Sequence, residues 1–399
     1  MKNLIKQNIF EYLSYIMILT LFFSKAVPNI ILILLSVSFF TNFNLKEYKI
    51  TISSGIILFG LLALLFFKSL IYGAIGYDLK VYKGIFLSFW LSLLLQKIRN
   101  IKSFKLFVLL GINACILSSL FLIGLFFYKN HTLPFANTDE VNKLLILERP
   151  YMGFVSVLGF LLSIEKAFFL VKHRCLYIIN SIILILFIIL ISARISIITI
   201  FCISGVYFLF YYKVKWYKKV LFSTAIILLF GLIIYMNKNI SERFFVKSSI
   251  EESIQVASDY EPRIVIWNCA SDMSEKKDFN LITGFKGYEI IDNNFLECYA
   301  RTIENQSKKE YFLSEKFNSH NQFIDFYLIG GILGLGLFIS FFIKLFYEVK
   351  RDFFSLAIAI SFMLFFLVEN IFYRQFGCYL FGIFILILIP AKKGSNEKN

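Results

Sequence analysis

Long apolar runs, separated by short charged breaks, recur along almost the whole chain. A helix that crosses a bilayer needs about 20 predominantly apolar residues. Runs of that kind lie near residues 9–25, 27–43, 50–67, 84–96, 104–128, 150–171, 175–192, 195–212, 219–236, 320–346, 353–369 and 375–390. We therefore predict an all-α polytopic membrane protein with about 12 transmembrane helices. The first run follows two lysines, as a signal peptide does, but a second run starts at once, so we expect it to be retained as a helix.

The composition agrees with this interpretation. Of the 399 residues, 58% are apolar and only 17% are charged, whereas a soluble domain is about half apolar and about a quarter charged. The bilayer is thus the expected solvent for most of the chain, and we expect membrane lipids to surround it.

The placement of the charges predicts the orientation. The net charge is +15, and with the N-terminus inside, the basic clusters of the short loops all fall on one side. Such a bias marks the cytoplasmic side, so both termini are expected there and the basicity does not indicate nucleic-acid binding. The clusters are Lys46/Lys49, Lys97/Arg99/Lys102/Lys105, Lys172/Arg174, Lys213/Lys215/Lys218/Lys219, Lys350/Arg351 and Lys392/Lys393.

One long polar segment, residues 237–319, interrupts the pattern and falls on the outer side. It has 14 acidic and 11 basic residues, and a connection of this length is usually functional. "SERFFVKSSIEESIQVA" and "EPRIVIWNCASDM" have helical spacing, the second with Pro262 in its first turn, and "TGFKGYEI" is typical of a turn with a short strand. We predict helices 1–9 in residues 1–236, a helical periplasmic loop in 237–319, and helices 10–12 with a cytoplasmic tail in 320–399.

Cysteines say little about chemistry. Cys269 and Cys298 both lie in the outer loop, where they form either a disulfide, if the compartment is oxidising, or two free thiols. The sequence has neither a Cys/His cluster with metal-ligand spacing nor a convincing acidic metal motif, so we expect no metal and no other cofactor.

Three residues at the outer face are candidates for chemistry. Arg194 lies between two apolar runs, where an arginine is costly unless it is paired or reaches the headgroups. Arg263 is near a helix N-terminus, where the dipole favours anions, although pairing with Glu261 is an alternative. His320 begins the tenth run after Asn318 and Ser319, either of which can cap the helix; the alternative is a plain surface histidine.

Taken together, these three side chains favour one kind of reaction. A histidine titrates near neutral pH and can accept the proton of a hydroxyl group. Arginines bind diphosphates through paired hydrogen bonds and stabilise the charge of a departing diphosphate. The pattern predicts sugar transfer from a lipid diphosphate to an acceptor hydroxyl at the outer membrane face, with His320 as the base.

These residues also resemble a known family, the O-antigen ligase and polymerase superfamily of bacterial membrane glycosyltransferases. His320-Asn321 followed by Gly331-x-x-Gly334 is similar to its signature at the exit of the large periplasmic loop. "SARIS", "EPRIVIW", "GFKGYEIIDN" and "ENIFYRQFG" are similar to its arginine between helices, its loop arginine, its glycine turn and a segment before the last helix. At "ERPYMG", Arg149 stands where some relatives have a histidine before the proline.

The resemblance implies a GT-C-like fold in the inner membrane with the active site facing the periplasm. It further implies metal-independent, inverting transfer from an undecaprenyl-diphosphate-linked glycan to the lipid A core or to a lipid-linked glycan. Arg194 and Arg263 would hold the diphosphate and His320 would activate the acceptor. Weaker candidates for diphosphate binding are Arg149, Lys286, Arg301 and Arg374.

Other functions remain open at this stage. We favour a ligase, but a polysaccharide polymerase needs the same donor site. A transporter or flippase would show paired halves and ionisable or broken helices at the midplane, and the sequence shows neither feature clearly. A cell-wall polymerase that uses a lipid-linked peptidoglycan precursor would need an acidic catalytic residue in the long loop, and none stands out there.

Overall fold

The structure is a computed structural model that describes residues 2–41, 54–132, 138–169, 173–213, 215–219 and 262–389, with the single residues 224, 228 and 231. The predicted run at 219–236 and the helix predicted in "SERFFVKSSIEESIQVA" fall outside the described residues, apart from those single positions and residue 219. All regular structure in the described part is helical, apart from one isolated bridge between Asn280 and Gly284.

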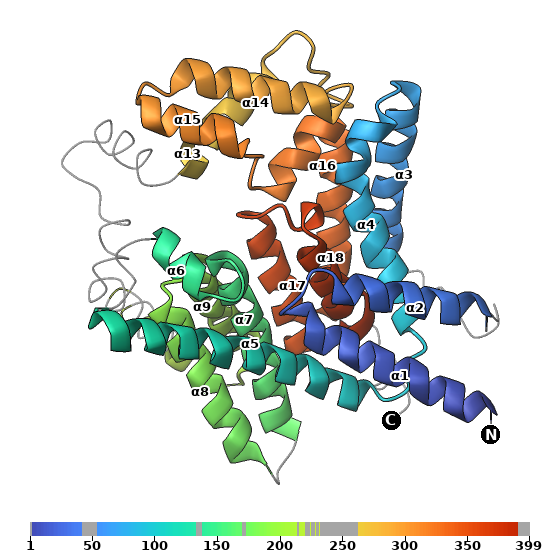
Figure 1. Ribbon diagram of the computed structural model, residues 1–399, viewed down its shortest axis with the longest axis vertical. Helices are drawn as coiled ribbons and strands as arrows, with labels where there is room; N and C mark the ends of the chain where they lie inside the picture. The colour runs from blue at the N-terminus through green and yellow to red at the C-terminus, as the bar shows by residue number, and fades with distance from the viewer. Residues whose placement is uncertain are drawn as a thin grey trace.

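Most helices begin and end close to the predicted runs (Figure 1), but the helices Lys2–Leu21 and Ile75–Leu95 start seven and nine residues before the runs at 9–25 and 84–96. The short helix α6 was not predicted. In chain order the first nine are α1 Lys2–Leu21, α2 Val27–Thr41, α3 Gly55–Ile71, α4 Ile75–Leu95, α5 Ile101–Asn130, α6 Thr138–Leu144, α7 Arg149–Phe169, α8 Arg174–Leu190 and α9 Arg194–Val206. After the outer segment, the bundle continues with α16 Gln322–Val349, α17 Phe353–Phe366 and α18 Gln375–Phe381, which η5 extends as Gly382–Leu388.

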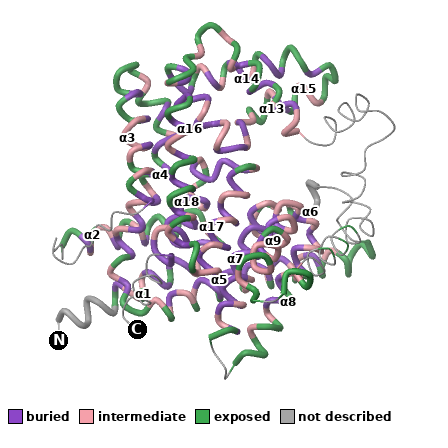
Figure 2. Tube along the Cα trace, turned by 180° about the vertical axis from the view of Figure 1, so that it is seen from behind, coloured by how far each residue is buried: buried purple, intermediate pink, exposed green. Residues whose placement is uncertain are grey.

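Length and composition make the bundle a multi-pass membrane protein. Four described helical stretches are long and apolar enough to cross a bilayer, Ile101–Asn130, Arg149–Phe169, Arg194–Tyr211 and Gln322–Val349, and shorter apolar helices accompany them. Figure 2 shows buried positions along the interior of the bundle and exposed positions on its outside. Many of the exposed side chains are large and apolar, such as Phe121 and Ile343, as expected where lipid replaces water. The number of spans stays a prediction.

The two ends of the bundle differ. At one end the backbone N–H of Ser54, just before α3, donates to Glu348 near the end of α16. The hydroxyl of Tyr211, after α9, donates to the carbonyl of Lys350. The basic cluster Lys350/Arg351 therefore lies at this end of the bundle. The start of α16 lies at the other end, and that end carries the described part of the outer segment (Figure 1).

That outer part is a cap of three helices, α13 Pro262–Ser274, α14 Tyr288–Thr302 and α15 Gln306–Glu315. The predicted helix at Pro262 is confirmed, but the predicted strand is wrong, because Tyr288 starts a helix whose apolar face packs into the cap. Cys269 and Cys298 form a disulfide between α13 and α14, which settles the alternative left open by the sequence.

Candidate active site

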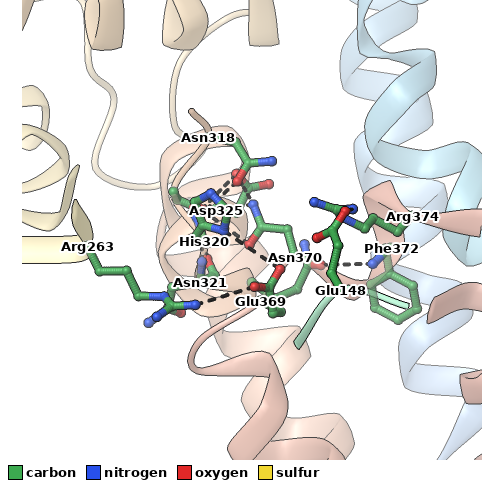
Figure 3. A network of polar contacts seen from close by, with 12 residues as sticks. Glu148, Arg263, Asn318, His320, Asn321, Asp325, Glu369, Asn370, Phe372 and Arg374 are labelled. Atoms are coloured by element: carbon green, nitrogen blue, oxygen red, sulfur yellow. Dashed lines mark hydrogen bonds and ion pairs between the residues drawn. The ribbon is translucent and has the colours of Figure 1, made fainter. Parts of the chain in front are cut away.

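A buried carboxylate joins two of the three predicted residues. Glu369 lies in the connection after α17 and is 6% exposed, and its Oε1 is 3.4 Å from Arg263 Nη2. Its Oε2 is 3.7 Å from His320 Nδ1. Figure 3 shows Arg263 and His320 reaching Glu369 from different segments. The cap, the loop before α16 and the connection after α17 thus meet at one point.

The local backbone places His320 in an unusual way. Its φ is +44°, in the left-handed region that side chains with a Cβ seldom adopt. The Oδ1 of Asn318 accepts from the His320 N–H at 3.0 Å, and the Trp267 indole donates to the Ser319 carbonyl. The capping prediction was wrong, because Asn321 caps α16 by accepting from the N–H groups of the next turn. Asn318 instead holds the backbone of the histidine.

A second buried carboxylate, that of Asp325, accepts hydrogen bonds from side chains of several of these segments. Asp325 in α16 is fully buried and accepts hydrogen bonds from the hydroxyls of Tyr288 on α14 and Tyr373 after α17. Ser319 and Asn370 donate to the same carboxylate. Burial and the charge of Asp325 raise the pKa of both phenols well above the ordinary value. Both tyrosines therefore stay protonated and hold the neighbours of His320 and Glu369 in place.

The charge state of Glu369 follows from its surroundings. Burial by itself would raise the pKa of this carboxyl group, but the interaction with His320 and the positive charges of Arg263 and Arg374 outweigh it. The pKa of Glu369 is consequently lower than that of an ordinary glutamate. Glu369 is an anion at neutral pH, and it can orient an imidazole and balance a positive charge on it.

Arg374 and Arg149 lie at the same end of the bundle. Arg374 pairs with Glu148, the residue before α7, and its guanidinium lies over the ring of Tyr151 at 5.7 Å. Arg149 starts α7, and its backbone N–H donates to Asn142 Oδ1. A cavity of about 410 Å³ opens beside the Arg374–Glu148 pair, and its lining is mostly apolar. It is lined by Leu21, Phe22, Phe23, Ser24, Lys25, Pro28, Ile146, Leu147, Glu148, Tyr151, Arg374, Gln375 and Phe376.

Arg194 also lies near the start of α7. It is the first residue of α9, directly after the tight turn that contains Ser192 at φ +51°. A Cβ on Gly153 in α7 would come within 2.4–2.5 Å of Ser196 and Ala193, so the first turns of α7 and α9 pack closely. Arg194 and Arg149 are therefore both at helix starts on this side, although neither contacts the Glu369 pair directly in the described structure.

The two weaker candidates on the cap lie elsewhere. Arg301 on α14 pairs with Asp272 on α13 at 3.3 Å, and both side chains are mostly exposed. Lys286 precedes α14, with its Nζ 6.0 Å from the ring centre of Tyr72. Their contacts hold the cap together or join it to the end of α3, and no contact in the described part of the chain joins them to Glu369.

Glu369 itself was not predicted as a site residue. It ends the eleventh apolar run and begins "ENIFYRQFG", so its position in the sequence is that of an ordinary interfacial residue. A carboxylate at the end of an apolar run, inside a segment with family resemblance, was the available signal. Its partners lie 49 and 106 residues away, and only the fold brings them together.

Comparisons with known proteins show a likeness to one family over part of the chain. A family model described as O-antigen ligase matches residues 179–339, a range that includes Arg194, Arg263 and His320. A search of curated proteins finds no match to the chain. The matched range ends inside α16. It includes the cap and the loop before α16, two of the three elements that meet at the candidate site. Residues 179–339 are thus similar to the O-antigen ligase family.

Proposed function

We propose that this protein transfers an undecaprenyl-diphosphate-linked glycan to an acceptor hydroxyl at the periplasmic face of the inner membrane, and that the acceptor is the lipid A core. The observation that carries the proposal is the buried carboxylate of Glu369 between Arg263 and His320. In this arrangement His320, a potential base, and Arg263, a cation that can bind phosphate, both contact the anionic carboxylate of Glu369.

In the proposed reaction His320 is the general base. Glu369 faces Nδ1, so Nε2 is left to take the proton of the acceptor hydroxyl. The acceptor oxygen bonds to the anomeric carbon as the bond from that carbon to the diphosphate oxygen breaks. The lipid diphosphate leaves with the electron pair, and direct attack from the opposite face inverts the anomeric centre. The anionic Glu369 stabilises the imidazolium that forms, as a carboxylate does in a catalytic triad.

The arginines bind the leaving group in this proposal. Arg263 and Arg194 hold the diphosphate, with Arg149 and Arg374 as further cations on the same side. A guanidinium group presents five N–H donors in a plane, so Arg263 can contact Glu369 with one edge and phosphate oxygens with others. Because arginines neutralise the developing charge, we expect transfer to be independent of metal ions.

The orientation rests on two features. The basic cluster at Lys350/Arg351 lies opposite to the cap, as expected if that end is cytoplasmic. The disulfide between Cys269 and Cys298 lies in the cap, and disulfides persist in oxidising compartments such as the periplasm. Both features support a periplasmic candidate site.

The test is deletion of the gene followed by gel analysis of the cell-surface glycolipid. Bare core together with full-length polymer on its lipid carrier is the result expected for a ligase. Core that carries a single repeat unit would make the protein a polymerase. An unchanged ladder would contradict both assignments.

Complementation with point variants tests the site. Arg263→Ala should abolish transfer at normal membrane levels, and Arg263→Lys should also be poor because the planar fork is lost. His320→Ala should reduce the rate about 10²–10⁴-fold, and a loss below about tenfold would reduce His320 to an orienting residue. Arg351→Ala, an exposed arginine at the opposite end, is the matched control and should transfer normally.

A further inference from the structure

The turn between α13 and α14 enters a break in α16. Gly331 in α16 has φ +58° and ψ −155°, so the helix is interrupted there. The positive φ of Gly331 favours a glycine at the break. A Cβ on Gly331 would lie 2.4 Å from the carbonyl carbon of Ile282. The tip of the turn therefore occupies the space beside Gly331.

The turn replaces the hydrogen bonds that the break removes. In an unbroken helix the N–H groups of Ile332 and Leu333 would donate to Leu328 and Ile329. Here they donate to the carbonyls of Leu281 and Ile282 at 2.9 and 3.2 Å. The carbonyl of Leu328 accepts from the N–H of Phe285 instead.

A buried lysine supplies the remaining donor. Lys68 in α3 is 8% exposed, and its Nζ donates to the carbonyls of Thr283, Phe285 and Ile329. Within the turn, Asn280 Oδ1 accepts from the N–H groups of Ile282 and Thr283. A turn in water would not need these partners, since water would satisfy its backbone. In a bilayer core, by contrast, irregular backbone must be satisfied by the protein.

Two neighbouring helices, α16 and α3, give similar values for the depth of the turn in the bilayer. Leu333 is 16 residues before Val349 at the opposite end of α16, which is about 24 Å at 1.5 Å per residue. Lys68 is 14 residues after Ser54, about 21 Å by the same rise. Ser54 and Glu348 are hydrogen bonded, so both distances start from one level. A hydrocarbon core is about 30 Å thick. With the Ser54–Glu348 level placed at its cytoplasmic boundary, both positions lie in the outer half of the core.

The surface at that depth is apolar. Leu281 and Ile282 at the tip of the turn and Ile332 and Leu333 on the neighbouring helix each expose 45–58% of their surface. The turn thereby continues the lipid-facing surface of α16, which is a candidate membrane span.

We infer that residues 280–285 form a re-entrant turn that inserts the cap into the outer leaflet. The acyl chains of lipids contact Leu281 and Ile282. Lys68 is the clamp of the turn, because its ammonium group donates to carbonyls of both the turn and α16. The insertion fixes the position of the cap, which carries Arg263, relative to α16. The inference concerns membrane insertion and does not depend on the proposed reaction.

Spin labelling in liposomes tests the insertion. In a background with the exposed Cys175 and Cys202 replaced by serine, a label is placed at Ile282→Cys, with Ile343→Cys as the lipid reference and Ser307→Cys as the water reference. We expect the label at 282 to collide more with oxygen than with a water-soluble nickel chelate, as at 343. Behaviour like that at 307 would overturn the insertion.

The role of Lys68 is tested with the same label. Lys68→Met removes the donor to three carbonyls, so the label at 282 should become accessible to the nickel chelate. Lys68→Arg keeps a donor and should retain more of the lipid-like signal. If the label in Lys68→Met stays as protected as in the parent, Lys68 is not the clamp. If the Lys68→Met protein does not accumulate, the Lys68→Arg protein decides the question. A label at 282 that is as accessible to the nickel chelate in Lys68→Arg as the label at 307 would overturn the role of Lys68.

Discussion

The substitution Glu369→Gln tests the central arrangement of the site, because it removes the charge and keeps the size. At 3.7 Å, a carboxylate and an imidazolium attract each other by roughly 4 kcal/mol at an effective dielectric constant of about 20. The pair exists only when His320 has taken up a proton, and desolvation offsets part of the attraction. We expect a loss of about 2–3 kcal/mol in the transition state, which is about a 10²-fold fall in kcat.

The assay is the initial rate of transfer by purified protein in liposomes, with the lipid-linked glycan and acceptor glycolipid extracted from the deletion strain. Glu165→Gln is the matched control, because Glu165 is also a buried carboxylate, paired with Lys105 at 2.8 Å at the end of the bundle away from the cap. It should cost stability and leave kcat within about threefold. A similarly small effect of Glu369→Gln on kcat would refute the idea that this carboxylate supports proton transfer.

Three further predictions concern stability. The disulfide between Cys269 and Cys298 spans 29 residues, so its reduction should destabilise the cap by about 3–4 kcal/mol and speed its proteolysis; an unchanged digestion rate would contradict this. Gly331→Ala should lower the thermal unfolding midpoint because the new Cβ meets the turn, whereas Gly336→Ala, which has open space around it, should not; equal midpoints would count against the inserted turn. Because the pKa of Glu369 is lowered on folding, its contribution is present above about pH 4.3 and is lost as the pH falls through the lowered value. The stability difference between wild type and Glu369→Gln should therefore shrink in acid, and a constant difference from pH 7 to pH 3 would disagree.

Much of the candidate site could be predicted from the sequence, because certain side chains are costly in a membrane. Arg194 and His320 are recognisable because each lies at the edge of an apolar run, where a polar group is costly. Arg263 is recognisable because it lies near a helix N-terminus, where the dipole favours an anion rather than a cation. The fold brings Arg263 and His320 to one carboxylate, while their catalytic roles stay predictions. Lys286 and Arg301 were weaker candidates from the sequence, and in the structure their contacts lie within the cap or at the end of α3.

The sequence by itself determined most of the apolar helices of the bundle and their approximate ends, because a backbone in lipid must satisfy its own hydrogen bonds and only continuous helices do so locally. It also determined the start of α13 at Pro262. The tertiary structure alone decided the break at Gly331, the clamp by Lys68 and the position of Glu369. Each of these depends on donors and acceptors far apart in the chain, and no local pattern of apolar and polar residues reports such a pairing.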